Sequence, residues 1–109
     1  MIQTLTPQQA YELVTHNDVE VIDVREPAEW NSGHLAGARL VPLESLRRSP
    51  SASLPRDGVL FVCAAGVRSQ TAARLAESMG FKSVYNLSGG TRAWVKAGLP
   101  LTNELSVAV

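Results

Sequence analysis

Short apolar runs alternate with amphipathic segments along this chain of 109 residues. The runs are largely apolar, which is typical of strands buried on both faces, and they span residues 19–24, 38–43, 59–62 and 83–87. Helices are predicted between and around them, over residues 4–17, 27–33, 69–80 and 89–100. This alternation predicts an α/β fold, with a central parallel sheet flanked by helices on both faces.

The start of the first helix carries a clear local signal. Thr6 is suited to be its N-cap, Pro7 its first helical residue and Gln9 the reciprocal partner in a capping box. Asn17 follows the last apolar position and is suited to the left-handed conformation that ends many helices. We therefore expect a capped helix directly before the first predicted strand.

Two segments fall outside the alternation. Residues 47–58 are rich in Ser, Pro and Arg, which favours a surface connection. Its arginines, Arg47, Arg48 and Arg56, would line the mouth of a site only if the connection folds over it. The tail, residues 101–109, is apolar and is expected to pack on the body, to cover a sheet edge or to form an oligomer contact.

Composition and charge exclude several classes of function. The length suits one domain, residues 1–109, with a single core. Ten basic and ten acidic residues balance, so no surface for nucleic acid or an anionic membrane is expected. The N-terminus lacks a signal-peptide pattern, and no apolar run approaches the roughly 20 residues that span a bilayer, which favours a cytoplasmic protein. One cysteine and two histidines predict neither a disulfide nor a metal site.

The single cysteine, Cys63, directly follows the apolar run 59–62, and ligands of open α/β sheets bind beyond the carboxyl ends of strands. In "CAAGVRS", Gly66 allows a positive φ, so that backbone N–H groups and a helix starting near Ser69 converge on the sulfur. Such donors should lower the pKa of the thiol below its ordinary value of about 8.5 and make it a nucleophile. Arg68 would add a cation at the rim for an anionic substrate. A plain packing role for Cys63 stays open, because free cysteines are often buried.

Three stretches together resemble the rhodanese family of sulfurtransferase domains. "VIDVREPAEWNSGHLAGARLVPL" resembles its first signature, an Asp-x-Arg after a strand, then a Glu-aromatic pair and a Gly-His turn. "CAAGVRS" resembles its active-site loop, and "NLSGGTRAWVKAGLPL" its closing signature. The resemblance runs in family order over residues 5–100, which leaves residues 101–109 as a tail.

This resemblance implies a parallel sheet of about five strands and a persulfide carried on Cys63. The donor would be thiosulfate, a polysulfide or a low-molecular-weight persulfide, and the acceptor cyanide or a thiol, possibly on a protein. No metal or organic cofactor is implied, and a monomer or weak homodimer is expected. The residues expected to contact substrate are Ala64, Ala65, Gly66, Val67, Arg68 and Ser69.

Other signature residues are expected to support the site. Asp23 and Arg25 follow a buried strand, where charges are costly unless paired, so a buried ion pair that positions the loop is favoured over substrate contact. His34 sits in a turn, and a thiolate needs no general base. Packing or tight-turn roles are expected for Trp30, Trp94, Gly89 and Gly90.

Two other functions stay open. A phosphatase or arsenate reductase would use a similar cysteine loop, but tyrosine-phosphatase-type loops place five residues between Cys and Arg, whereas four separate Cys63 from Arg68. The histidine that often precedes a phosphatase cysteine is replaced by Val62. A sulfur-carrier or regulatory binding module is the other alternative, and the retained cysteine favours catalysis over it.

Overall fold

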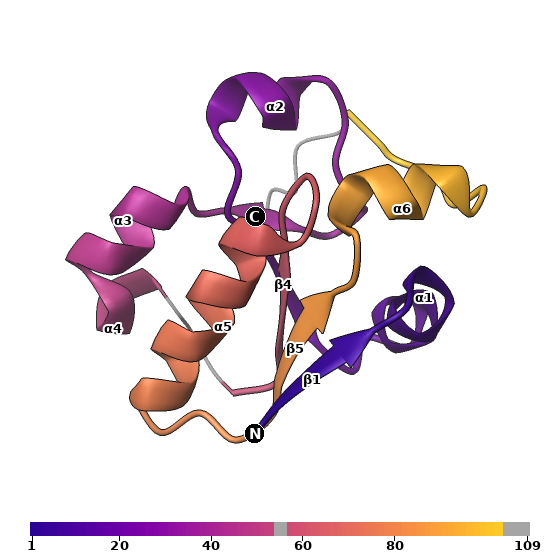
Figure 1. Cartoon of the computed structure of the whole chain (residues 1–109). Helices are drawn as coiled ribbons and strands as arrows, with labels where there is room; N and C mark the ends of the chain where they lie inside the picture. The colour runs from indigo at the N-terminus through magenta and orange to yellow at the C-terminus, as the bar shows by residue number, and fades with distance from the viewer. Residues whose placement is uncertain (54–56, 104–109) are drawn as a thin grey trace.

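The computed structural model describes residues 1–53 and 57–103 (Figure 1). The strands are β1 (Ile2–Leu5), β2 (Glu20–Asp23), β3 (Arg39–Leu40), β4 (Val59–Val62) and β5 (Val84–Leu87). The helices are α1 (Pro7–Thr15), α2 (Pro27–Asn31), α3 (Leu43–Arg48), α4 (Pro50–Ser53), α5 (Val67–Ser78) and α6 (Gly90–Lys96). All strands belong to one five-stranded sheet with the order β1-β5-β4-β2-β3, and every pairing is parallel. The predicted α/β fold is therefore confirmed.

Helices cover both faces of this sheet, as the largely apolar strands predicted. The two faces have separate cores, because successive side chains of a strand point in opposite directions. Phe61 of β4 packs in the core under α3 and α5, whereas its neighbour Leu60 packs in the core that α1 and α6 cover. In Figure 1 α5 and α6 lie on opposite sides of the strands. Because β4 is central, all four of its residues are buried.

The start of α1 confirms its local signal. Thr6 Oγ1 accepts a hydrogen bond from the Gln9 backbone N–H at 3.2 Å, and Gln9 Oε1 accepts one from the Thr6 N–H at 3.0 Å. Pro7 is the first helical residue. Beyond the helix, Asn17 has a φ of +58°, the left-handed conformation expected at a helix end.

The sequence pattern missed β1, whose residues are mostly exposed or half-buried. As an edge strand it has only one neighbour, β5, and half of its sequence is polar. The rule that parallel strands are apolar throughout therefore fails for it. The signature range of residues 5–100 accordingly left out Ile2, Gln3 and Thr4, which pair with β5.

The connection expected over residues 47–58 lies at the surface in its described first part, but that part is largely helical. The end of α3 and the whole of α4 occupy residues up to Ser53, and Leu46, which is fully buried, anchors α3 to the core. Pro50 is the first residue of α4, a position where a missing N–H costs nothing. Asp57 ends the connection by accepting hydrogen bonds from the Lys82 and Ser83 N–H groups. Residues 54–56 lie outside the described part of the chain.

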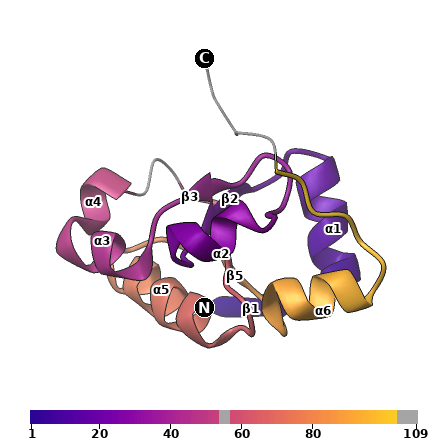
Figure 2. The ribbon, with the colours of Figure 1, turned by 90° about the horizontal axis from the view of Figure 1, so that it is seen from above.

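The carboxyl ends of β2 and β4 meet at one edge of the sheet, where Asp23 pairs with Val62 in register. Helix α2 follows β2 and lies over this edge, as Figure 2 shows from that end of the molecule. Within the described ranges, no helix has the length and apolar character needed to cross a membrane. The fold thus brings Cys63, α2 and the start of α5 together.

Candidate active site

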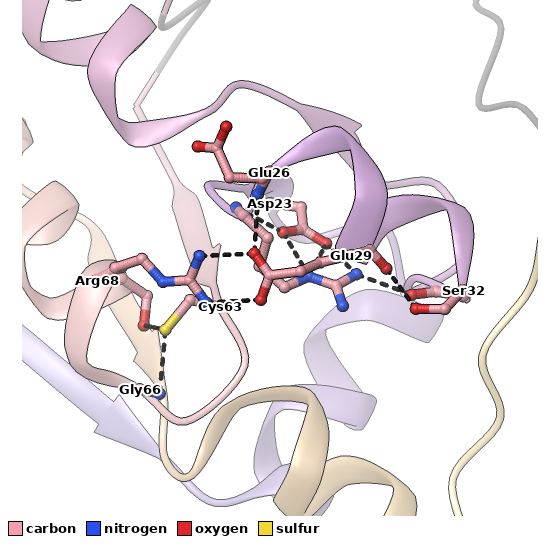
Figure 3. A network of polar contacts seen from close by, with 10 residues as sticks. Asp23, Glu26, Glu29, Ser32, Cys63, Gly66 and Arg68 are labelled. Carbon is pink, nitrogen blue, oxygen red and sulfur yellow. Dashed lines mark hydrogen bonds and ion pairs between the residues drawn. The ribbon is translucent and has the colours of Figure 1, made fainter.

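Cys63 lies directly after β4, at the carboxyl edge of the sheet, and only 1% of it is exposed. Its Sγ atom accepts a hydrogen bond from the Gly66 backbone N–H at 3.0 Å (Figure 3). The same atom lies 3.3 Å from the hydroxyl oxygen of Ser69, which is fully buried. A cysteine that only fills space does not need these polar contacts, so the arrangement favours a chemical role.

Gly66 turns the chain after Cys63 into α5. Its φ is +98°, in the left-handed region that favours glycine, and it is the N-cap of the helix. The helix begins at Val67, whereas the sequence predicted a start near Ser69. The earlier start places Ser69 in the first turn of α5, where its hydroxyl reaches the sulfur.

The N-terminus of α6 holds the loop from the other side. The Thr91 N–H donates to the Cys63 carbonyl oxygen at 2.8 Å, and the Arg92 N–H donates to that of Ala64 at 3.1 Å. A Cβ atom on Gly90 would lie 2.3 Å from the Cys63 carbonyl oxygen, so only glycine allows this approach. Gly90 and Gly89 therefore make a tight turn beside the loop, in agreement with the sequence interpretation.

The pKa of the Cys63 thiol results from opposing effects. Burial alone would raise the pKa, because the charged thiolate loses water. The Ser69 hydroxyl and the backbone N–H groups of Ser69, Ala65 and Gly66 outweigh this effect and lower the pKa below that of an ordinary cysteine. The thiolate is therefore favoured by neutral hydrogen-bond donors, as the sequence predicted.

Arg68, which the sequence predicted to be a cation at the rim, is paired with a carboxylate. Its guanidinium binds the Glu29 carboxylate with two hydrogen bonds, of 2.7 and 2.8 Å (Figure 3). The hydrogen bond from Arg68 lowers the pKa of Glu29 to about 2, so this pair is charged at neutral pH. Because a carboxylate already satisfies the guanidinium fork, Arg68 does not present an unpaired fork to a tetrahedral oxyanion.

The predicted loop residues differ in their access to solvent. Ala65 and Val67 are exposed, and Ala64 and Gly66 are half-buried. Ser69 is fully buried and contacts the sulfur. The loop therefore presents small or apolar side chains at the mouth of the site, with Ser69 beneath them and the Glu29–Arg68 pair beside them.

Asp23 and Arg25 form the buried ion pair that the sequence favoured. The Arg25 Nε and Nη2 atoms donate to the Asp23 carboxylate at 2.7 to 3.0 Å, and both side chains are almost inaccessible. Arg25 Nη2 also donates to the Gly33 carbonyl oxygen at 2.8 Å. This pair fixes the conformation of the segment that leads from β2 into α2. It therefore helps to hold α2 in place over the site.

His34 and the described part of the tail have structural roles, because both pack against the body of the protein. His34 is buried and its ring stacks on Trp30, with ring centroids 3.5 Å apart. Its backbone pairs with Thr102 in an isolated antiparallel bridge, with N–H to oxygen distances of 2.9 and 2.7 Å. Trp94 is buried and donates from Nε1 to the Pro100 carbonyl oxygen. Residues 101–103 thus pack on the body, one of the outcomes expected for the tail, whereas residues 104–109 lie outside the described ranges.

Of the arginines in the predicted connection, the structure describes Arg47 and Arg48, both in α3. Arg47 forms an ion pair with Glu44 of its own helix at 2.8 Å, and both side chains are largely exposed. Arg48 is the last residue of α3 and is exposed. Arg56 falls in the part of the chain that the structure leaves undescribed.

Sequence reasoning assigned no site role to two residues that the fold brings to the loop. Glu29 holds Arg68, and Asn86 of β5 accepts the hydrogen bond of the Ser69 hydroxyl. Glu29 belongs to the Glu-aromatic pair of the first signature, so a signal was present. The sequence contained a weaker indication of a role for Asn86. An amide side chain in an otherwise apolar strand requires polar partners once it is buried.

Comparison with known proteins supports one family. The rhodanese-like domain family matches residues 6–97. The thiosulfate sulfurtransferase GlpE of Pseudomonas aeruginosa is 34% identical over 92 residues, which cover 84% of this chain and 83% of the relative. The structure resembles that of a rhodanese-related protein from Thermoplasma volcanium, with a TM-score of 0.83 and 30% identity, over 94% of this chain and 99% of the other.

A second similar structure is described as a possible tyrosine phosphatase. It comes from Rhodopseudomonas palustris, has a TM-score of 0.83 and 33% identity, and the match covers 93% of this chain and 85% of that one. Proteins with this fold are thus ascribed different reactions. The fold alone therefore does not identify the reaction, which has to be inferred from the residues of the site. With the family match over residues 6–97 and the parallel sheet of five strands, the chain belongs to the rhodanese-like domain family.

Proposed function

We propose that this protein is a sulfurtransferase that moves a sulfane sulfur from a small donor to a thiol or cyanide through a persulfide on Cys63. The observation that carries the proposal is the environment of the sulfur. Sγ accepts the Gly66 N–H and contacts the Ser69 hydroxyl at the carboxyl edge of the central strand. The GlpE relative, named a thiosulfate sulfurtransferase, supports the same chemistry.

In the first step, the Cys63 thiolate attacks the outer sulfur of the donor. A new Sγ–S bond forms, and the donor's own sulfur–sulfur bond breaks with its electron pair leaving on the remainder. Thiosulfate then releases sulfite, and a persulfide anion releases a thiolate. The negative charge moves to the outer sulfur of Cys63, where the N–H groups of the loop stabilise it.

In the second step, an acceptor nucleophile attacks that outer sulfur. Cyanide becomes thiocyanate, or a thiolate becomes a persulfide, and the Sγ–S bond breaks to return the Cys63 thiolate. The chain has no other cysteine, so no internal thiol can take the sulfur. The acceptor is therefore a separate molecule, a small thiol or a thiol on another protein.

The charge at the mouth bears on the choice of donor. Because Glu29 neutralises Arg68, and Ala64 and Ala65 are uncharged, the Cys63 loop itself carries little net positive charge to attract a thiosulfate dianion. We therefore favour persulfides and polysulfides as donors over thiosulfate. We further propose that the protein acts in the cytoplasm, where thiols stay reduced. It would act there as a monomer or a weak homodimer.

Intact mass spectrometry tests this proposal directly. After exposure to a polysulfide or thiosulfate, the protein is expected to gain one sulfur atom, which cyanide or a thiol then removes. Cys63→Ser should gain none, and Val95→Ala, which changes an exposed residue of α6 outside the loop, should gain it normally. Absence of the adduct with every donor would contradict a persulfide mechanism. An adduct that no acceptor removes would support a carrier or regulatory module instead.

The phosphatase alternative has its own assay. Hydrolysis of a generic phosphate ester should be absent, because Glu29 occupies the guanidinium fork and the loop has four residues between Cys63 and Arg68. Turnover that depends on Cys63 would establish the alternative, whichever result the sulfur assay gives.

A further inference from the structure

A chain of buried polar groups continues beyond the sulfur, from Cys63 through Ser69 to Asn86. Ser69 Oγ lies 3.3 Å from Cys63 Sγ and donates a hydrogen bond to Asn86 Oδ1. Ser69 is fully buried and Asn86 is 5% exposed, so water does not readily replace either partner. The reaction described above uses Ser69 as a donor to sulfur but gives Asn86 no part.

The other contacts of Asn86 fix the orientation of its amide. Asn86 Nδ2 donates to Gln70 Oε1 at 2.8 Å and to the Gly66 carbonyl oxygen at 3.4 Å. Its Oδ1 atom is therefore the end that faces Ser69, and it accepts the Ser69 hydroxyl hydrogen. In this arrangement the neutral Cys63 thiol can donate its own hydrogen to Ser69 Oγ, so every group has a partner.

Loss of the thiol proton creates a conflict. The thiolate has no hydrogen to donate, and Ser69 adds to the stabilisation that the backbone N–H groups give it only by turning its single hydrogen towards the sulfur. Asn86 Oδ1 then loses its donor in a buried site, which is costly. The asparagine and the sulfur thus need the same hydrogen in the ionised state.

We propose that Asn86 is a positioning residue that competes with the Cys63 sulfur for the single hydroxyl hydrogen of Ser69. The competition limits how strongly Ser69 stabilises the thiolate. This limit is useful because the nucleophilicity of a thiolate falls as its basicity falls. As far as the proposed sulfur transfer holds, the hydrogen returns to Asn86 once the charge has moved to the outer sulfur of the persulfide.

Charged groups also surround Cys63, and the variants that test the proposal leave them intact. The end of β2 contributes the Asp23–Arg25 pair, α2 contributes Glu29, and α5 contributes Arg68. The first turn of α6 carries Arg92. None of these groups bonds to Asn86, so a change in thiol reactivity on substitution of Asn86 reports on the hydrogen bonds.

The test is the pH dependence of Cys63 alkylation by iodoacetamide. At a pH where the thiol form dominates, Asn86→Ala should react roughly threefold to tenfold faster than the wild type, because one charge-assisted hydrogen bond is strengthened. Ser69→Ala should react more slowly by a similar factor. In the Ser69→Ala background, Asn86→Ala should have no effect, because no hydrogen remains to compete for. Thr4→Ala, which changes the residue paired with Asn86 on β1, is the matched control and should leave the rate unchanged.

A second variant covers the case in which Asn86→Ala does not fold. Gln70→Ala removes the acceptor that orients the Asn86 amide and should raise the rate in the same direction, by a smaller factor. The proposal is overturned if Asn86→Ala or Gln70→Ala slows alkylation or leaves it unchanged, or if the effect persists without the Ser69 hydroxyl. Alkylation requires no sulfur donor, so its result is independent of whether the protein transfers sulfur.

Discussion

Two arginine–carboxylate pairs lie near the sulfur, and they differ in burial and in reach. The Asp23–Arg25 pair joins residues two apart and has side chains only 1% and 5% exposed. The Glu29–Arg68 pair joins residues 39 apart, α2 to α5, and both side chains are 35% exposed. Similar chemistry therefore serves two purposes, one fixing a turn inside the fold and the other connecting two elements across the mouth of the site.

The difference in burial decides what each pair contributes. Removing one partner of a buried pair leaves an uncompensated charge without water, which costs about 3–5 kcal/mol. An ion pair that solvent reaches is screened and contributes about 0–1 kcal/mol. We therefore expect the buried pair to be needed for folding and the exposed pair to influence mainly the charge that a substrate meets.

The largest effect is expected from Asp23→Ala. This change leaves the Arg25 guanidinium buried with only the Gly33 carbonyl as a partner, and it should lower the free energy of unfolding by about 3–5 kcal/mol. Denaturant titration measures the loss. The double variant Asp23→Leu with Arg25→Met removes both charges and should recover part of the stability. A loss below about 1 kcal/mol in the single variant would remove the distinction between the two pairs.

A smaller effect on stability, and a specific effect on kinetics, is expected from Glu29→Gln. The amide keeps an acceptor for the Glu26 backbone N–H, so the start of α2 should persist. The free energy of unfolding should fall by about 1 kcal/mol or less. The unpaired Arg68 should raise kcat/KM for thiosulfate about fivefold, since one added charge acting on a dianion is worth on the order of 1 kcal/mol in water.

Steady-state kinetics at low and high salt measure this gain, which salt should diminish. Arg68→Gln is the matched control and should lower kcat/KM for thiosulfate. If Glu29→Gln and Arg68→Gln change the kinetics in the same direction, the pair acts through structure, and the charge argument fails.

The smallest effect is expected from pH. The Arg68 hydrogen bond lowers the pKa of Glu29 from 4.5 to about 2 on folding, so its contribution to stability is complete above about pH 4.5 and is lost as the pH falls towards 2. The difference in stability between the wild type and Glu29→Gln should therefore be constant from pH 8 to 5 and shrink below that. A difference that grows on acidification would contradict the assigned pairing.

The sequence predicted the features that are determined by residues close together in the chain. A wholly apolar strand identified β4, the Thr6–Gln9 pair identified the start of α1, and Gly66 identified the turn after Cys63. Each of these features depends on residues close together in the chain. For the same reason, the buried Asp23–Arg25 pair, two residues apart, was within reach of sequence reasoning.

The features that were missed depend on long-range contacts. Nothing local indicates that Glu29 would neutralise Arg68, because that pairing exists only once α2 lies over the sheet edge. Asn86 reaches Ser69 only because β5 is the neighbour of β4. β1 was missed because an edge strand does not require the apolar pattern that identifies a central one.

The bridge between His34 and Thr102 has a practical consequence for attaching reporters or partner proteins. It fixes the end of the described chain beside the segment that carries α2, the helix that lies over the sheet edge where Cys63 follows β4. The N-terminus instead begins β1 at the amino edge of the sheet, where Met1 pairs with Glu77 at the far end of α5. A fluorescent tag or surface tether is therefore best joined through a linker at Met1, where it leaves the approach to the thiol open.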